Sequence, residues 1–239
     1  MATPLMSSPM VVGQQLFTTS ADQLHNLGER VETNDGRAYR YCKAGATTLV
    51  VGKLQQSAAE LTNHQNLTPV AAAIGDTSVT VALGATAATA NQYAGGYLVV
   101  TLTPGQGQQY KIKSHPAAAL STSVVLTLED PIVVAITTSS RCDLVPNPYS
   151  AVVINPTTAT SSPVGVAIFA ITNGQFGWLQ VEGPATIVAD GAITVGVNVS
   201  ASNAVAGAVE AAVTAQGAVG RALTGIADAD HGAIMLNLG

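Results

Sequence analysis

The residues able to do chemistry are few in this chain, and their spacing fits no metal-binding pattern. The histidines His25, His64, His115 and His231 are scattered, and none lies four residues from another as in a zinc-binding helix. Asp228–Gly232 (DADHG) begins like a metal-ligand run but lacks the remaining ligands of a calcium loop, notably its twelfth-position glutamate. We therefore expect four histidines that bind no metal and a surface turn at 228–232.

Patterns for nucleophiles and phosphate binding are also missing. The sequence holds no Gly-x-Ser-x-Gly, and its serines and histidines show no arrangement typical of a triad. Gly105-Gln106-Gly107 lacks both the third glycine of a dinucleotide loop and the Gly-Lys-Ser/Thr of a P-loop. We expect no catalytic, cofactor-binding or metal-binding residue, no cofactor and no enzymatic activity.

The two cysteines, Cys42 and Cys142, have no CxxC spacing. Free cysteines are among the most buried residue types, so two buried free thiols are predicted. A disulfide between them remains the alternative, because sequence alone does not fix cysteine pairing.

The composition favours a folded chain that buries surface against a partner. Of 239 residues, 47% are hydrophobic but only 4% aromatic and 10% charged, with a net charge of −5. This apolar content suffices for a core, whereas free monomers normally carry more surface charge. No stretch of about 18 apolar residues predicts a membrane span, and the first residues lack the basic and apolar parts of a secretory signal. We expect no membrane partner.

Basic residues are concentrated near the start of the chain. Arg30, Arg37, Arg40, Lys43 and Lys53 are five of the nine lysines and arginines. They are too dilute for a nucleic-acid patch and have no aromatic platform beside them, so no nucleic-acid partner is expected. Two interpretations remain open, namely ordinary solvated side chains and a basic face that meets an acidic partner.

The elements that must position these residues are short strands, arranged around the stretch 174–199. Its apolar residues alternate with polar ones, and Gly183-Pro184 and Asp190-Gly191 break the runs, which is typical of antiparallel strands and turns. It holds the only tryptophan, Trp178, which we predict to anchor a core. Further strands are predicted at 38–42, 47–51, 78–83, 96–102, 109–114, 124–128, 132–137, 151–155, 165–171, 177–181, 193–199, 208–215, 219–222 and 233–238.

The predicted fold class is all-β, with two small antiparallel sandwich or barrel units and an extended N-terminal arm. The arm covers residues 1–30, with at most a short helix that starts at Thr19 or Ser20. Residues 31–69 form a hairpin and connector that pack with the C-terminal unit. Residues 70–149 form a middle β domain, and residues 150–239 form a C-terminal β-barrel-like domain.

Two long segments resemble one family. The segment 34–56 (NDGRAYRYCKAGATTLVVGKLQQ) combines a hairpin turn, an aromatic and basic strand, an Ala-Gly spacer and Gly-Lys-Leu. The segment 174–199 (GQFGWLQVEGPATIVADGAITVGVNV) places Trp-Leu-Gln-x-x-Gly-Pro before a hairpin. Together with GQQYKIKSHP and LEDPIVVAI in the middle of the chain, they resemble the capsid decoration, or cement, proteins of tailed phages, including marine and cyanobacterial phage forms.

The resemblance implies a virion protein on the capsid exterior, made in the host cytoplasm. Such a protein binds an icosahedral shell, often as a homotrimer, and cements neighbouring subunits of the major capsid protein. We expect the contacts to come from the arm up to Leu16 and from Arg30, Arg37, Arg40 and Lys43. The alternatives are a tail, fibre or receptor-binding module, or another head or tail component.

Overall fold

The computed structural model describes residues 13–212 and 217–239 and confirms the all-β fold class. Every ladder among the described residues is antiparallel. The chain divides into two units: unit 1 runs up to Ala58 and resumes at Pro148–Gly239, and unit 2 is Ala59–Asn147. The sequence-based boundaries were placed after residues 69 and 149, so residues 59–69 lie in unit 2.

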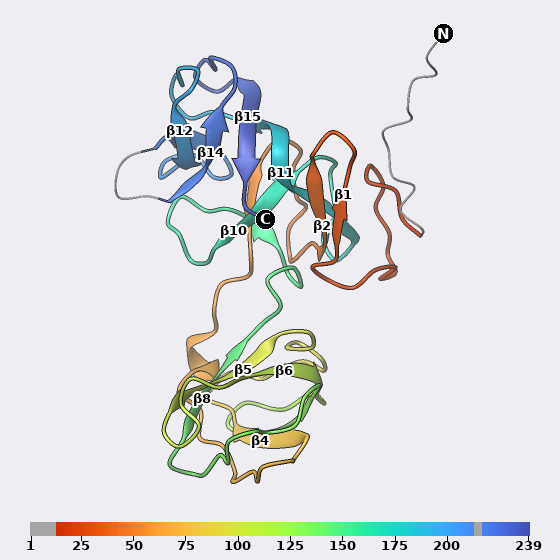
Figure 1. Cartoon of the computed structure of the whole chain (residues 1–239), viewed down its shortest axis with the longest axis vertical. Helices are drawn as coiled ribbons and strands as arrows, with labels where there is room; N and C mark the ends of the chain where they lie inside the picture. Colours follow the sequence, from red (N-terminus) through yellow and green to blue (C-terminus); the bar gives the residue numbers. More distant parts are fainter. Residues whose placement is uncertain (1–12, 213–216) are drawn as a thin grey trace. The chain divides into compact units, whose positions relative to one another are not determined.

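Unit 1 is built on one ten-stranded sheet in the order β13-β12-β14-β15-β11-β10-β3-β9, with β2 also on β11 and β1 on β2 (Figure 1). Its strands are β1 (Arg30–Glu32), β2 (Ala38–Lys43), β3 (Leu54–Gln56), β9 (Val153–Ile154), β10 (Pro163–Ala167), β11 (Phe176–Val188), β12 (Asn198–Ala201), β13 (Val209–Ala211), β14 (Ala218–Ala222) and β15 (His231–Asn237).

The longest strand, β11, joins the parts of this sheet. Its first half pairs with β2, from Phe176 to Glu182, and its second half pairs with β15, from Glu182 to Val188. Gly183-Pro184 was expected to end a strand, but β11 continues through it. Gly183 has φ 84°, and a Cβ there would lie 3.0 Å from backbone and side-chain atoms of Arg37. The Gly-Pro pair therefore lies where the strand changes partner, at a position whose positive φ and close neighbour favour glycine.

Side chains of β11 point alternately to opposite faces of the sheet. Along the length of the strand they pack in three separate apolar clusters. Phe176 and Trp178 pack in an aromatic cluster, Leu179 packs in a second cluster, and Ala185 and Ile187 pack in a third. The aromatic cluster contains Leu16, Tyr39, Tyr41, Phe176 and Trp178. The second contains Cys42, Ala44, Leu49, Val152, Val164, Ala167, Ile171 and Leu179. The third includes Leu54, Val166, Ile193, Val199, Val209, Val219, Ile226, Ile234 and Leu236.

The described part of the expected arm, residues 13–30, covers the aromatic cluster of its own unit. Leu16 is buried there, and Ser20 forms an isolated antiparallel bridge with Phe176. The chain follows turns and bends up to Glu29, so the short helix considered near Thr19 is not formed. Residues 1–12 lie outside the described residues.

Unit 2 is a small barrel closed by one segment of chain. Its sheet has the order β4-β7-β6-β5-β8. Leu67 exchanges two backbone hydrogen bonds with Cys142 of β8 (2.8 and 3.0 Å), while Thr68 and Val70 bond to β4 on the other edge (3.1 and 2.8 Å). The elements are a short 3-10 helix, η1 (Thr62–His64), β4 (Ser78–Ala82), β5 (Tyr97–Leu102), β6 (Gln109–Ser114), β7 (Ser123–Leu128) and β8 (Arg141–Val145).

The core of unit 2 is a single cluster of mainly aliphatic residues. It includes Leu67, Val79, Val81, Tyr93, Leu98, Val100, Tyr110, Ile112, Val124, Leu126, Ile132, Ile136, Cys142 and Leu144. The predicted strand at 132–137 is replaced by an irregular segment with an isolated bridge at Ile136, and β8 was not predicted.

One turn recurs through both units. Four pairs of residues exchange reciprocal backbone hydrogen bonds outside the strands: Leu49 with Ile171, Ala72 with Ile136, Ala88 with Ala118, and Ile193 with Ile226. Three residues after seven of these eight, the backbone has a positive φ, at Gly52, Gly75, Asn91, Ser121, Gly174, Gly196 and Ala229. A strand begins five residues after six of the eight bridge residues. The chain thus reuses one bridge, turn and strand unit. It replaces the strand predicted at 47–51 and the first part of the strand predicted at 193–199, whose last residues belong to β12.

Candidate contact surface

The predicted contact residues all lie in unit 1, around β1, β2 and the segment that precedes them. Arg30 stands directly opposite Arg40 across the β1–β2 ladder. Leu16 is 5% exposed, because it packs against the aromatic cluster of its own chain. The four cations are therefore gathered around one hairpin, whereas Leu16 presents almost no surface.

Two of the four cations are neutralised within the unit. Arg30 donates to Glu32 (Nη1 to Oε2, 2.8 Å) and forms a second ion pair with Glu182, and Arg37 pairs with Asp35 (Nε to Oδ2, 2.8 Å). The side-chain hydrogen bond to Glu32, and then that to Glu182, raise the pKa of Arg30. These pairs leave little net positive charge at the turn of the hairpin.

Arg40 and Lys43 have other partners. The Arg40 guanidinium donates to the Gly28 carbonyl (2.9 Å) and lies 5.8 Å from the ring centroid of Tyr149. The Lys43 ammonium lies 5.3 Å from the ring centroid of Phe176. Neither forms an ion pair with a carboxylate within residues 13–212 and 217–239. They are the two cations of the set that still have a charge to offer to an acidic surface.

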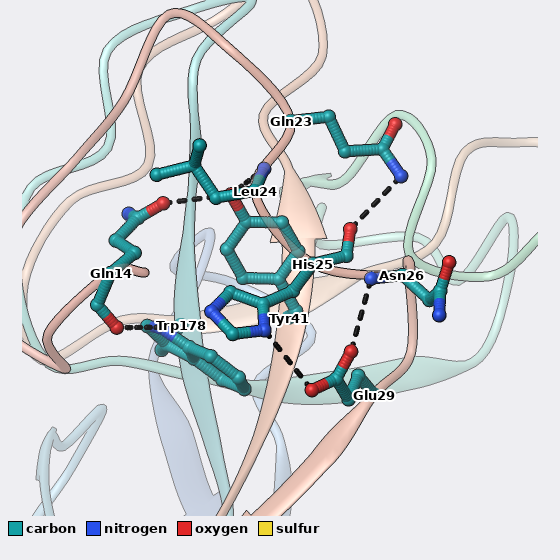
Figure 2. A network of polar contacts seen from close by, with 8 residues as sticks. All are labelled: Gln14, Gln23, Leu24, His25, Asn26, Glu29, Tyr41 and Trp178. Carbon is teal, nitrogen blue, oxygen red and sulfur yellow. Dashed lines mark hydrogen bonds and ion pairs between the residues drawn. The ribbon is translucent and has the colours of Figure 1, made fainter. Parts of the chain in front are cut away.

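Beside this hairpin, a polar network fixes the start of the described chain (Figure 2). The Tyr41 hydroxyl donates to Gln14 Oε1 (2.7 Å), and the Trp178 indole N–H donates to the Gln14 carbonyl (3.2 Å). The Gln14 amide donates in turn to the carbonyls of Thr18 (2.8 Å) and Phe176 (3.1 Å). Trp178 is 1% exposed, so it lies in the core position predicted for it, with its polar edge used to hold Gln14.

His25 lies within this network. Its ring is 5.1 Å, between centroids, from both Tyr41 and Trp178, and its Nδ1 is 3.0 Å from Glu29 Oε1. Its Nε2 is buried without a hydrogen-bond partner among residues 13–212 and 217–239, and faces Gly13, where a Cβ would lie 3.2 Å away. Sequence spacing did not reveal this cluster, because its members come from three distant segments of the chain.

Two other histidines are structural in unit 2. His64 Nε2 donates to the Thr86 carbonyl (2.9 Å) and its Nδ1 bonds the Tyr93 hydroxyl, while His115 Nε2 accepts from the Tyr93 backbone N–H (3.0 Å). Burial raises the pKa of Tyr93 to about 12. Within the part of the chain that the structure describes, no three His, Cys, Asp or Glu side chains gather as a metal site.

Both thiols are free and buried, as predicted. Cys42 lies in unit 1 and Cys142 in unit 2, and they form no disulfide. Burial raises the pKa of the Cys42 thiol far above its ordinary value and that of Cys142 to about 11. Neither thiol is therefore poised as a nucleophile.

Apolar side chains are exposed at the tips of the recurring turn. Two residues after the bridge, the tips carry Val51 (48% exposed), Ile74 (69%), Leu120 (58%) and Val195 (59%). Phe169, two residues before the Leu49–Ile171 bridge, is also exposed, and the Gly52 N–H donates to the nearby Ala167 carbonyl (2.9 Å). Sequence reasoning missed these tips because it assigned 47–51 and 193–199 to strands.

Unit 1 also contains a pocket of about 350 Å³ between the loop 155–163 and the strands β12 and β14. Its described lining residues are uncharged and include Asn155, Thr157, Ala159, Ser161, Ala201 and Val219. No helix among the described residues is long and apolar enough to cross a membrane. Neither a protein-family model nor a curated protein nor a solved structure matches the chain.

Proposed function

We propose that the chain is a structural protein of a tailed phage that decorates the capsid. In this role it binds the outer surface of the icosahedral shell as a homotrimer and cements neighbouring major capsid subunits, without catalysing a reaction. The resemblance of segments 34–56 and 174–199 to decoration proteins supports the family assignment. The all-β fold, shared by both units, is compatible with it.

The observation that carries the proposal is the surface, which combines few charges with exposed apolar tips in both units. Only 10% of residues are charged, while Val51, Ile74, Leu120 and Val195 project from equivalent turns. Isolated apolar residues are normal on a protein surface, but repeated ones on rigid turns offer several small contacts at once. Many weak contacts across a lattice give strong attachment through avidity.

In this proposal, the electrostatic contact with the shell is made by Arg40 and Lys43. Arg30 and Arg37 already have carboxylate partners, so an acidic surface would have to compete with those carboxylates for them. Arg40 and Lys43 remain available to meet an acidic shell surface.

The test is co-sedimentation of the purified chain with empty shells of its major capsid protein, and with disassembled capsid subunits as a control. Decoration predicts saturable binding to shells, with a stoichiometry set by lattice positions, and higher thermal stability of the decorated shells. Absence of binding to shells, together with binding to isolated tails or fibres, would overturn decoration in favour of a tail component.

A further inference from the structure

We propose that residues 1–12 of one copy bind the uncharged pocket beside loop 155–163 of a second copy, and so link copies head to tail. The inference rests on the proposed assembly role, since it names the contact by which copies of the chain join. It is carried by the chemistry of the pocket, the composition of residues 1–12 and the place where the described chain begins.

The pocket is suited to an extended, uncharged peptide. Its volume of about 350 Å³ lies in the range of ordinary ligand pockets. Prolines, alanines and Val219 supply apolar surface, while Thr157 and Ser161 supply hydroxyl groups. None of its described lining residues is charged or aromatic, which disfavours ionic ligands and stacked sugar rings.

The loop that forms one wall has unused backbone hydrogen-bonding groups. Among the described residues, no backbone N–H from 157 to 161 donates a hydrogen bond to another backbone carbonyl. Behind it, Gln56 donates to Thr160 Oγ1 (2.7 Å), but its buried Oε1 has no partner. Main-chain groups of this kind are what an added peptide strand satisfies, and they give affinity without requiring charge.

Residues 1–12 (MATPLMSSPMVV) have the matching composition. They contain no Asp, Glu, Lys, Arg or His, and combine apolar side chains with Ser, Thr and Pro. Transfer of this segment into an uncharged pocket therefore desolvates no charged side chain. Its two prolines also favour an extended backbone and lower the entropy lost on binding.

In unit 1, the start of the described chain and the pocket lie at different places along the sheet. The Gln14 network holds the start of the described chain beside β2 and the first half of β11 (Figure 2). The pocket lies at β12 and β14, which the sheet order places beyond β15 on the other side of β11 (Figure 1). Exchange of residues 1–12 between copies would join a donor site and an acceptor site at different places on the unit, and such a heterologous contact gives a ring such as a trimer when the rotation between copies closes.

The experiment is disulfide trapping between two differently tagged full-length proteins, Met6→Cys and Ala159→Cys. Both native cysteines are buried, so they do not compete. After mixing and mild oxidation with oxidised glutathione, we expect a mixed dimer, mapped by mass spectrometry to residues 6 and 159. Its yield should be about ten-fold above a control mixture with Thr172→Cys, because binding brings the thiols to a millimolar effective concentration. Thr172 is exposed on a turn of the same unit, outside the pocket.

A yield no higher than the control overturns the inference, as does trapping only inside a chain that carries both cysteines. Trapping of Met6→Cys only onto shell subunits also overturns it, while it leaves decoration itself intact. A second variant, Ala159→Trp, fills the exposed mouth of the pocket without touching a core. It should lower the mass of the assembly measured by light scattering to that of the 24.1 kDa chain.

Discussion

Both units are small β structures with few aromatic residues, but their apolar cores are built differently. Unit 2 closes a five-stranded sheet into a barrel through residues 66–70 and fills it with one core. Unit 1 leaves its sheet branched and builds three smaller cores on the faces of one long strand, β11. Both units contain the recurring turn, so they differ in how the strands that follow these turns pair with one another.

This difference determines which substitutions should destabilise each unit. In unit 2 the core residues act together, and loss of one leaves a cavity in a single closed cluster. In unit 1 a change in β11 reaches more than one cluster, because Trp178, Leu179 and Ile187 each serve a different one. In unit 1, Tyr41 and Trp178 also hold the start of the described chain through hydrogen bonds to Gln14.

The largest expected effect is that of Trp178→Ala. It removes the largest fully buried side chain and the donor to the Gln14 carbonyl, so we expect a loss of about 3–5 kcal/mol in the stability of unit 1. Trp178→Phe, the matched control, keeps a ring but not the donor and should cost about 1–2 kcal/mol. Urea unfolding followed by circular dichroism measures both. A loss near zero for Trp178→Ala would mean that the aromatic cluster does not stabilise unit 1.

Ile112→Ala makes the corresponding cavity in unit 2. Ile112 is fully buried in the single core, so a loss of about 2–5 kcal/mol is expected. Trp178, the only tryptophan, reports on unit 1 alone, so its fluorescence transition in urea should not move. Val125→Ala on the exposed face of β7 is the control and should change stability little. A fluorescence transition that shifts together with unit 2 would show that the units unfold as one.

Strand-rich architecture was predictable from the sequence because alternation and turn residues are local signals. The strands of unit 2 at 78–83, 96–102 and 109–114 were predicted close to their observed bounds. The core position of Trp178 followed from its being a lone large aromatic residue in an apolar run. The tips of the recurring turn were missed, since an apolar pair such as Val50-Val51 before a glycine looks like the end of a strand.

The parts of the contact surface that could not be predicted depend on contacts between distant segments. Arg30 was assigned to a basic face, but Glu182 lies 152 positions away and reaches it only through the pairing of β2 with β11. Leu16 was assigned to a contact arm, yet the aromatic cluster that buries it is assembled from β2 and β11. Gly183-Pro184 was predicted to break a strand, but β11 continues through it because the strand changes its partner from β2 to β15 there. Pairing between such distant strands is a property of the whole sheet and cannot be read from the local sequence.

Gly220→Ala tests the branched sheet at the β14–β15 ladder. A Cβ at Gly220 would lie 2.3 Å from the Met235 carbonyl oxygen, a backbone atom that cannot move away freely. Strain of this kind costs about 1–3 kcal/mol, and it should leave the native fluorescence of Trp178 unchanged. Gly217→Ala is the control, because no atom lies within 4 Å of its added Cβ. Equal stability of the two variants in urea would contradict the close approach of β14 and β15.

Alkaline pH should weaken unit 2 through two buried acids. Burial raises the pKa of Tyr93 from 10.0 to about 12 and that of Cys142 from 9.0 to about 11. Between the two values of each group, the unfolded chain has lost a proton that the folded chain keeps, so stability falls as pH rises from 9 toward 12. About 1–3 kcal/mol is expected from Tyr93. Tyr93→Phe should flatten the upper part of this slope in urea midpoints; an unchanged slope would exclude Tyr93 as its source.

The smallest effect on stability, and the sharpest on binding, separates the two pairs of cations. Arg30→Ala with Arg37→Ala removes exposed ion pairs worth about 0–1 kcal/mol each, and should change shell binding little, because those charges are already paired. Arg40→Gln with Lys43→Gln keeps a polar, hydrogen-bonding side chain at each position but removes the two cations without carboxylate partners among the described residues. This second pair should weaken co-sedimentation with shells, with a smaller dependence on salt than the parent protein shows. If the first pair weakens binding more, Glu32 and Glu182 release Arg30 in the complex, and the ion pairs of the free chain do not predict its contacts.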